Sequence, residues 1–339
     1  MKNRVVLRAD GNSAIGMGHI FRCLALAEML KNNYHILFIS NYVDDKQRKI
    51  ITSICQCFEL NSADQVQEVS MLSEILNDDD ILVVDGYNFK EEYQINIKRI
   101  VKKLVVIDDL ANFHYYADLV INHGGETIEK QYVTESYTKV LTGFKYLIVR
   151  KEFIRSIHKE KTVKKIDTVF ICMGGADPFG ITMKALMACI QAKIAKNIIV
   201  VVGNAYKNID EIKALIDTEG NSLSVLLEIN VNAERMTELI AVSEISICPS
   251  SSISLEVCCV KSGLLTGTVI DNQQAINEQL VKNGCAINMG DLNSISIADI
   301  SMHLNNINSI NVVQNIIRNQ EIATANLSDH LLLKEFKLL

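Results

Sequence analysis

The chain has 339 residues, of which 48% are hydrophobic, and 34 basic against 40 acidic side chains give a formal net charge of −6. This length allows two domains with separate cores, and the lack of a basic cluster argues against nucleic acid or an anionic membrane as a partner. No apolar run reaches the roughly 18 residues of a membrane-spanning helix, and the start of the chain lacks a signal-peptide pattern, so we expect a cytoplasmic protein.

Short runs rich in valine and isoleucine alternate along the chain with longer helical patterns. They predict buried strands at residues 4–9, 34–39, 80–85, 103–108, 118–122, 167–172, 197–203, 223–229 and 244–249. Continuous apolar strands that alternate with helices are typical of parallel sheets with right-handed crossovers. The sequence therefore predicts an α/β protein with doubly wound, Rossmann-like sheets.

One basic, weakly apolar interval, residues 150–165, interrupts this alternation, and a new strand pattern begins directly after it. We predict a first domain at 1–150, a linker at 151–165, a second domain at 166–310, and a helical tail at 311–339 that packs back across the domains. Two Rossmann-like domains would then face each other across a cleft. Ligands of such sheets bind outside the carboxyl ends of the strands.

In the first half of the chain, small or ionisable residues follow the predicted strands. These stretches are DGNSAIGMGH (10–19), DGYN (85–88) and DDL (108–110), the last followed by NHGG (122–125). The first of them lies where a nucleotide loop would, but Phe21 stands where a dinucleotide fingerprint needs its third glycine, so that interpretation is weak. The imidazole of His19, if neutral near pH 7, suits general-base catalysis.

In the second half of the chain, small, polar or ionisable residues also follow three of the predicted strands. These stretches are MGGADPFG (173–180), GNAY (203–206) and PSSSISLEV (249–257). A helix is predicted after the first and the third, and the free amides and dipole of a helix N-terminus attract an anion. Gly174 and Gly175 would let a phosphate approach the backbone, and the hydroxyls of residues 250–252 can donate to its oxygens. Glu256, one turn further, is placed to accept from ribose hydroxyls, so the second domain is predicted to bind a nucleoside diphosphate.

Several motifs occur in a specific order along the chain. They are RADGNSAIGMGHIFRCLALA, VDGY, DLVIN, YLIVRKEF, FICMGGADP and CPSSSISLEV, followed by DNQQ at 271–274. In this order they resemble the UDP-2,4-diacetamido-2,4,6-trideoxy-β-L-altropyranose hydrolases of pseudaminic acid biosynthesis. That family is related to the peptidoglycan N-acetylglucosaminyltransferase and shares its two-domain glycosyltransferase-B fold. The resemblance covers roughly residues 4–290, while the remaining tail matches little.

The resemblance implies an enzyme that releases UDP from a UDP-linked diacetamido sugar with inversion, without a metal or cofactor. It also implies that His19 is the base for water. The substrate-binding positions would be Arg8, Gly18, Asp85, Tyr87, Asn272 and Gln273. The UDP-binding positions would be Gly174, Gly175, Ser251, Ser252 and Glu256.

The chemistry of the residues is compatible with this activity. A nucleoside diphosphate leaves as a stabilised anion, so the main requirement is to orient and deprotonate a water, for which a neutral imidazole is suited. The nine cysteines lack paired C-x-x-C spacing, which favours reduced thiols and argues against a zinc site. We expect the UDP-linked sugar as the partner and a monomeric chain.

Each assigned residue has a structural alternative. A histidine behind a glycine loop can simply begin a helix, the paired glycines can form a tight turn, and the serines can cap a helix. The strand-end carboxylates of Asp85, Asp108 and Asp109 can be solvated turn residues, and His123 can be part of a loop. The roles of Asp108, Asp109 and His123 therefore stay open at this point.

Other functions are compatible with the same motifs. An inverting glycosyltransferase of the same fold would need an acceptor surface, often with a basic amphipathic helix, which the first half of this sequence lacks. A hydrolysing UDP-N-acetylglucosamine 2-epimerase and a non-catalytic nucleotide-sugar sensor are further alternatives. The sequence fixes neither the stereochemistry of the sugar nor the nucleotide base.

Overall fold

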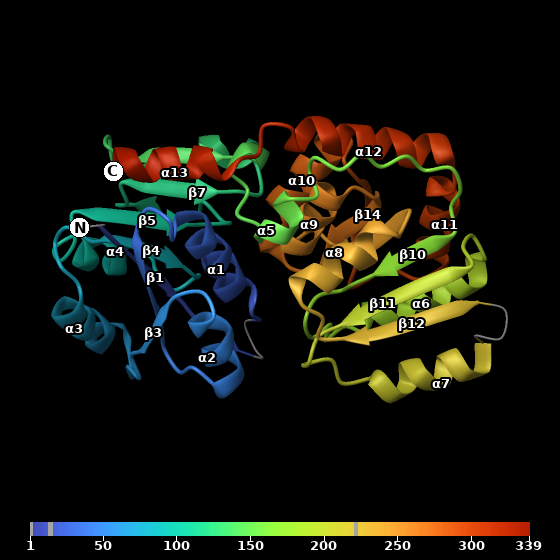
Figure 1. Ribbon diagram of the computed structural model, residues 1–339, viewed down its shortest axis with the longest axis horizontal. Helices are drawn as coiled ribbons and strands as arrows, with labels where there is room; N and C mark the ends of the chain where they lie inside the picture. The colour runs from blue at the N-terminus through green and yellow to red at the C-terminus, as the bar shows by residue number, and fades with distance from the viewer. Residues whose placement is uncertain (1–2, 13–15, 220–222) are drawn as a thin grey trace. The chain divides into compact units, whose positions relative to one another are not determined.

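The computed structural model describes residues 3–12, 16–219 and 223–339 and divides the chain into two compact α/β units (Figure 1). The first unit consists of Met1–Lys151 together with Leu327–Leu339, and the second consists of Glu152–Asn326. Within the described part of the chain, no helix combines the length and the apolar character that crossing a membrane requires.

The first unit is built on a parallel sheet whose described strands lie in the order β3-β2-β1-β4-β5-β7-β9. The strands are β1 (Arg4–Ala9), β2 (His35–Ser40), β3 (Gln56–Glu59), β4 (Ile81–Asp85), β5 (Lys103–Ile107), β7 (Leu119–Asn122) and β9 (Lys139–Thr142), with β6 (His114–Tyr115) and β8 (Val133–Thr134) paired separately. The central strands are buried almost throughout because their valines and isoleucines pack on both faces.

Helices connect these strands, and the last helix of the chain adds to the same unit. They are α1 (Gly18–Leu30), α2 (Asp45–Thr52), α3 (Gln65–Ile75), α4 (Glu91–Ile97) and α13 (Asp329–Leu338), with the short turns η1 (Thr127–Gln131) and η2 (Phe144–Tyr146). Helix α1 begins at Gly18 and is buried along most of its length, so the two polar side chains His19 and Arg22 lie among apolar neighbours. A capping box fixes the start of α2: the Asp44 carboxylate accepts from the backbone amide of Gln47, and the Gln47 side chain accepts from the backbone amide of Asp44.

The second unit repeats this plan with the described strand order β12-β11-β10-β13-β14-β15, again in parallel. Its strands are β10 (Thr168–Ile171), β11 (Asn197–Val202), β12 (Ser224–Ile229), β13 (Ile245–Pro249), β14 (Gly263–Thr268) and β15 (Ile287–Asp291). Its helices are α6 (Ile181–Ala192), α7 (Ile209–Glu219), α8 (Ala233–Ala241), α9 (Ser252–Val260), α10 (Gln274–Lys282), α11 (Ile297–Ile307) and α12 (Ile310–Thr324), with the turn η4 (Asp271–Gln273), and α5 (Lys151–Ile154) begins at the end of the first unit.

All nine predicted strands are present, with ends that differ by about one residue from the predicted ranges. The prediction of an α/β protein with two Rossmann-like sheets is confirmed. The strands that were not predicted are β3, β9, β14, β15 and the short pair β6 and β8. Strands β3, β9 and β15 lie at sheet edges, and β14 contains two glycines and two threonines.

The predicted linker and tail differ from the units that form. Residues 152–165 belong to the second unit, where the buried ammonium of Lys261 donates to the carbonyls of Ile157 and Lys159 and the ammonium of Lys161 donates to those of Ile240 and Ser243. These bonds fasten the segment, so it is a packed part of the second unit.

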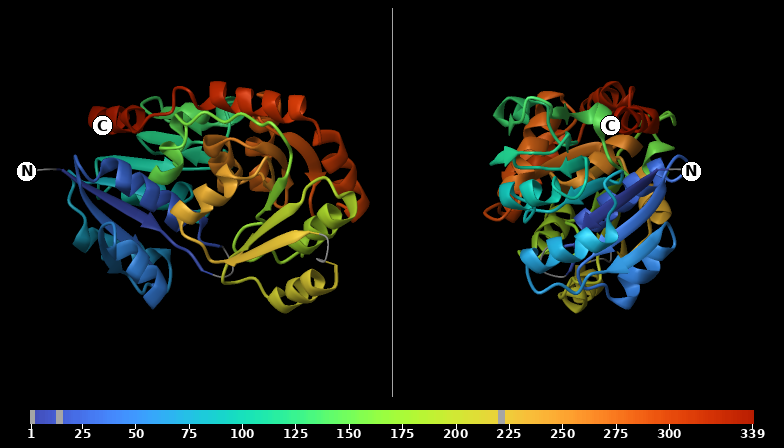
Figure 2. Two further views of the ribbon diagram at one scale, coloured as in Figure 1. Left: turned by 45° about the vertical axis from the view of Figure 1, so that its right-hand side comes forward. Right: turned by 90° about the vertical axis from the view of Figure 1, so that its left-hand side faces the viewer.

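The predicted tail divides between the units. Helix α12 packs against α9 and β14 of the second unit, whereas α13 contacts α1 and η2 and belongs to the first unit (Figures 1 and 2). The ring of Phe336 is buried against Tyr34, and Glu335 forms an ion pair with Lys139. The apolar side of α13 therefore completes the core of the first unit.

Candidate functional site

In each sheet, the order of the strands reverses between two central neighbours, and the predicted strand-end residues lie at this topological switch point. In the first unit, β1 and β4 are neighbours, and Ala9 pairs with Asp85 at their carboxyl ends. In the second unit, β10 and β13 are neighbours, and the turns that follow them hold the MGG and PSSS motifs. Ligands of open α/β sheets bind at such switch points, so both units present their candidate residues where the topology favours a site.

His19 and Asp85 form a direct pair at the switch point of the first unit. The Nδ1 atom of His19 lies 2.7 Å from Oδ1 of Asp85, and both side chains are buried. The same carboxylate receives Nη2 of Arg22 at 2.6 Å on Oδ1 and Nε at 2.7 Å on Oδ2. With its Nδ1 turned to the carboxylate, the imidazole keeps Nε2 as the nitrogen that can accept a proton from a ligand or water.

Arg22 also joins two residues whose roles the sequence left open. Its Nη1 and Nη2 atoms donate to the carboxylate of Asp109 at 2.7 and 3.0 Å, and Nη1 lies 3.2 Å from Nε2 of His123. Asp108, by contrast, accepts from the amides of its own turn and from the hydroxyl of Tyr132. Asp109 and His123 are therefore part of the His19 network, while Asp108 shapes the loop.

The charges of this network set the protonation states of its members. Burial lowers the pKa of His19, but the charge of Asp85 and its hydrogen bond outweigh burial, so the pKa is raised above its usual value. Burial raises the pKa of Asp85, yet Arg22 and then His19 shift it well below the usual range. Burial also raises the pKa of Asp109, but the charge and hydrogen bonds of Arg22 outweigh burial and lower it. Burial and the charge of Arg22 lower the pKa of His123 to about 4, so this second histidine is neutral at pH 7.

Tyr87 and Gly18 flank the imidazole. The ring of Tyr87 meets that of His19 edge to face at 4.9 Å between centroids and is 38% exposed, so it offers a surface to a ligand. Gly18 is the first residue of α1, and a Cβ there would meet nothing within 4 Å. The structure thus brings His19, Asp85, Tyr87 and Gly18 together.

Arg8 does not take the position that the resemblance implied. Its guanidinium is 1% exposed and forms a two-pronged pair with Glu68 at 2.9 and 2.8 Å and a further bond to Asp10 at 2.6 Å. Asp10 in turn accepts from the amide of Asn41. Arg8 therefore fixes the base of the loop before α1, because its donors are used by protein carboxylates.

Asp85 differs from its predicted role in a similar way. It was expected to bind substrate, but its side chain is buried against His19, Arg22 and the thiol of Cys23. Its two oxygens are engaged by these neighbours. The structure therefore places Asp85 behind the histidine, where it orients the ring.

The MGG turn of the second unit offers open backbone but no free helix terminus. Gly174 has φ +87°, and Cβ atoms at Gly174 and Gly175 would meet nothing within 4 Å. A Cβ at Gly203 would lie 2.4 Å from the carbonyl oxygen of Gly175, so the neighbouring turn packs closely here. The first amides of α6 are bound by the carboxylate of Asp177, at 3.0 Å for Ile181 and 2.6 Å for Thr182. The expectation of an anion at this helix end is corrected, because Asp177 already fills it.

The N-terminus of α9 is different. Ser251 precedes the helix without a capping side-chain bond, so neither the N-cap residue nor an acidic side chain of the first turn neutralises this end of the dipole. Ser250 is fully buried and bonded to Thr266 and Asn277, so it supports the turn and is not one of the exposed donors. Glu256 lies on the same helix and is buried. Of the predicted phosphate ligands, Ser251 and Ser252 keep a position at the helix start.

Asn272 and Gln273 lie in η4, which follows β14, the neighbour of β13. The Gln273 side chain accepts the amide of Val269 at 2.8 Å and so closes its own turn. Asn272 is partly exposed on the same turn. These two residues therefore lie, like Ser251, beyond the carboxyl ends of the strands. The side chain of Gln273 is already used within its own turn.

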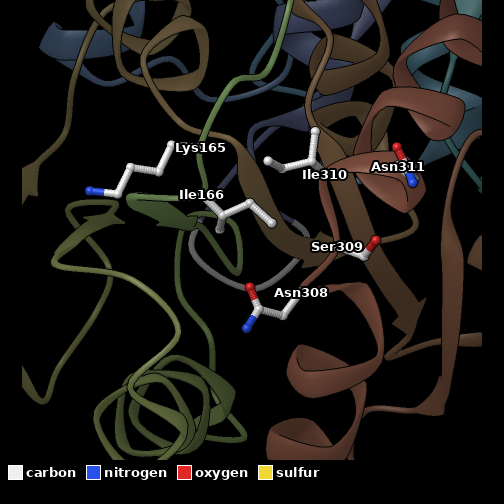
Figure 3. Close-up of a pocket in the computed structure, with 6 residues that line it drawn as sticks. All are labelled: Lys165, Ile166, Asn308, Ser309, Ile310 and Asn311. Carbon is white, nitrogen blue, oxygen red and sulfur yellow. The ribbon is translucent and has the colours of Figure 1, made fainter.

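A hollow of about 540 Å³ lies elsewhere in the second unit. Figure 3 shows that two segments line it. Residues 165–166 precede β10, and residues 308–311 include the first two residues of α12. Lys165, at its rim, is paired with Asp167 at 2.7 Å. This hollow lies at the amino end of β10, whereas the residues predicted to bind the nucleotide lie at the carboxyl ends of the strands.

Metal ligands were not expected, and the described residues contain no group of three or more His, Cys, Asp or Glu side chains that could hold a metal ion. At the first switch point, the guanidinium of Arg22 lies between the carboxylates of Asp85 and Asp109. A cation is therefore already supplied there by the chain.

Sequence reasoning missed Arg22 and Glu68. Arg22 does not stand at a strand end, where ligand-binding residues of such sheets are expected, but one turn into α1. Its signal is a single cation inside the apolar run IFRCLALA, since a charge that will be buried needs a partner. Glu68 lies on α3 with no motif around it, and only the fold brings it to Arg8.

Comparison with known proteins places these features in context. No family model matches the chain. An uncharacterised protein of Methanocaldococcus jannaschii is 30% identical over 250 residues, which are 70% of this chain and 49% of that protein, so the chain spans about half of its length. The UDP-2,4-diacetamido-2,4,6-trideoxy-β-L-altropyranose hydrolase of Campylobacter jejuni is 24% identical over 83% of this chain and 97% of its own. The spore coat polysaccharide biosynthesis protein SpsG of Bacillus subtilis is 24% identical over 83% of this chain and 82% of its own.

Solved structures show the same architecture at low sequence identity. MurG of Acinetobacter baumannii aligns with a TM-score of 0.69 at 10% identity, over 99% of this chain and all of that one. TcCGT1 in complex with UDP aligns with a TM-score of 0.67 at 11% identity, over 96% of this chain and 94% of that one. The sequence resemblance to the hydrolase is thus confirmed, and the chain has the glycosyltransferase-B fold.

Proposed function

We propose that this protein hydrolyses the glycosidic C1–O bond of a UDP-linked 2,4-diacetamido-2,4,6-trideoxyhexose and releases UDP and the free sugar with inversion. The observation that carries the proposal is the buried His19–Asp85 pair at the switch point of the first unit. The Campylobacter relative is named as a hydrolase of a UDP-linked diacetamido sugar, which supports the substrate class and hydrolysis. The reaction would be a step in the biosynthesis of pseudaminic or a related nonulosonic acid.

His19 acts as the general base. Asp85 accepts the Nδ1 proton, so Nε2 is the unprotonated nitrogen that takes a proton from water as the water oxygen attacks C1. The bond from C1 to the diphosphate oxygen breaks, and UDP leaves with the bonding electrons. General-base catalysis of this kind contributes about 10²–10⁴-fold.

The second unit binds the leaving group. The start of α9, with Ser251 and Ser252, provides amides and hydroxyls for the diphosphate, and Gly174 and Gly175 let it approach the backbone. Glu256 accepts from the ribose hydroxyls. A dispersed anion of this kind leaves without protonation, so the second carboxyl of a typical inverting glycosidase is dispensable, and neither a metal ion nor a cofactor is required.

Substrate contacts come from residues around the imidazole and from η4. Tyr87 and Gly18 lie next to His19 and can border the sugar ring. Asn272, on the turn after β14, is the remaining candidate for the sugar or the diphosphate. Arg8 and Asp85 contribute indirectly, through the loop and through the histidine.

Glycosyl transfer is the second candidate, because the solved structures of this fold include glycosyltransferases. A transferase passes the sugar to an acceptor hydroxyl, whereas a hydrolase passes it to water. Release of UDP without any acceptor, at the same rate as sugar formation, therefore distinguishes the two.

Incubation of the protein with UDP-linked diacetamido sugars and no acceptor should yield equal amounts of UDP and free sugar. His19→Asn should lower kcat by about 10²–10⁴-fold, since the base is lost, while the Kd for UDP stays near the wild-type value. His35→Asn, at an exposed histidine of the same unit, is the matched control and should keep wild-type turnover. Normal turnover of His19→Asn would remove the histidine from the mechanism.

The pH dependence of kcat/KM reports the base in the free enzyme. A base must be unprotonated, so activity falls as the pH drops through the pKa of His19, and the raised pKa puts this fall above about pH 6.5. Asp85→Asn removes the negative charge that raises this pKa, so the acidic limb should move to lower pH while the maximum rate falls. Rate profiles from pH 5 to 9 for both proteins test this, and an unshifted limb in the variant would contradict it.

Glu256→Ala should weaken UDP binding by roughly 10–100-fold, which corresponds to about 1.5–3 kcal/mol for a hydrogen bond to a charged group. Binding of 2′,3′-dideoxy-UDP should change little, because that ligand lacks the hydroxyls that Glu256 accepts from. Calorimetric titration of both ligands into both proteins provides the comparison. If the variant prefers the ribose form as strongly as the wild type does, Glu256 is not the ribose acceptor.

A further inference from the structure

Arg22 directs four of the five N–H groups of its guanidinium to the two carboxylates of the His19 network. Nε donates to Asp85, Nη2 donates to Asp85 and Asp109, and Nη1 contacts Asp109 and His123. These four N–H groups have carboxylate oxygens at 2.6–3.0 Å, and Nη1 also lies 3.2 Å from Nε2 of His123, whose Nδ1 accepts the amide of Ile148. A planar group held on two edges by two carboxylates has no freedom to rotate, and it transmits that rigidity to Asp85.

The elements packed around His19 contribute a defined set of charged and titratable groups. Asp85 ends β4 and Tyr87 follows it, while Asp109 follows β5 and His123 follows β7. Arg22 and Cys23 share α1 with the histidine. Two carboxylates therefore face one guanidinium, and the imidazolium form of His19 would bring the ionised groups to charge balance. The neutral form leaves one excess negative charge beside Asp85.

We propose that Arg22, held by Asp109, is a positioning residue that fixes the carboxylate of Asp85 and thereby the orientation and tautomer of His19. This rests on the proposed function only in the claim that His19 is a catalytic base. Asp109 has a second effect, because its charge offsets that of Arg22, which would otherwise disfavour the protonated imidazole. Asp109 thus maintains the basicity of His19 without touching it.

A purely structural ion pair is the alternative explanation, and the chain contains a matched example of one. Arg4 at the start of β1 forms a two-pronged pair with Asp80, just before β4. This pair joins the same two strands at their amino ends, whereas the His19 network lies at their carboxyl ends. Arg4→Lys removes a fork of the same kind and leaves the histidine untouched, so it serves as the control.

The protonation of His19 can be read directly by ¹⁵N NMR of the histidine-labelled protein, with His19→Asn to assign the signal among the 7 histidines. In the wild type we expect the neutral ring to carry its proton on Nδ1. Arg22→Lys keeps the positive charge but loses the planar fork, so we expect a mixture of tautomers. Asp109→Asn, which is nearly isosteric, should lower the titration midpoint of His19 while the tautomer is retained.

Kinetics supply the second readout. Arg22→Lys should lower kcat by about 10²-fold with little change in KM, because misplacement of a catalytic group acts on the chemical step. Asp109→Asn should move the acidic limb of the rate profile to lower pH, and Arg4→Lys should do neither. A wild-type tautomer in Arg22→Lys, or an unchanged midpoint in Asp109→Asn, would overturn the proposal.

The two proposals fail in different ways. If the wild type releases no UDP from any UDP-linked sugar, the proposed function fails, and the NMR comparison still decides whether Arg22 and Asp109 control His19. If Arg22→Lys does not fold, as judged by its thermal transition, Asp109→Asn alone carries the decision. If Arg4→Lys and Arg22→Lys change the His19 signal equally, losing a two-pronged arginine–carboxylate pair acts through the general stability of the unit, which would contradict the proposal.

Discussion

The ionised carboxylate of Asp85, buried at the end of β4, is the constraint on which the site of the first unit depends. Removing a carboxylate from water costs several kcal/mol, and only close, well-oriented partners offset that cost. Arg22 and His19 are those partners, and both are delivered by α1, which must therefore start directly after the glycine loop. Because β1 and β4 are adjacent, the helix that follows β1 places its first turn against the last residue of β4. The parallel sheet and the polar residues of α1 are thus parts of one arrangement that turns Nδ1 of His19 toward a buried carboxylate.

The second unit repeats the strand order, but its two switch-point turns have different chemistry. Asp177 binds the first amides of α6, so this helix end is neutralised by the chain itself. The start of α9 has no such side chain, since Ser250 is engaged beneath it and Ser251 forms no cap. A diphosphate would therefore be attracted to α9 and would meet the open backbone of Gly174 and Gly175 beside it. In the proposed reaction, one unit would supply the base and the other the anion-binding groups, which would suit a leaving group that is a stable anion.

Much of the fold could be predicted because buried parallel strands have a distinctive pattern of valine and isoleucine. Strands such as β3 and β15 were missed since they are exposed edges with polar residues or glycine, where pairing with a neighbour replaces apolar burial. That His19, Tyr87 and the serines at α9 would follow strands β1, β4 and β13 could be predicted from the sequence. The partners of Arg8 and the role of Arg22 could not, because Glu68 and Asp109 lie 60 and 87 residues away and no spacing rule connects them. Long-range pairing of buried charges is decided by the tertiary fold.

The bond that breaks is the most direct test of the proposed reaction. If His19 activates water for attack on C1, a single turnover in ¹⁸O-labelled water places the label on the anomeric hydroxyl of the released sugar, with none in UDP, and the first-formed anomer is inverted. Attack on phosphorus would instead label UDP or release UMP, as expected of a pyrophosphatase, and such enzymes usually recruit a metal ion. Mass spectrometry of both products, with an unlabelled-sugar control for exchange of the anomeric oxygen, decides between them. Label on the sugar alone is the predicted result, and label in the nucleotide would contradict the mechanism.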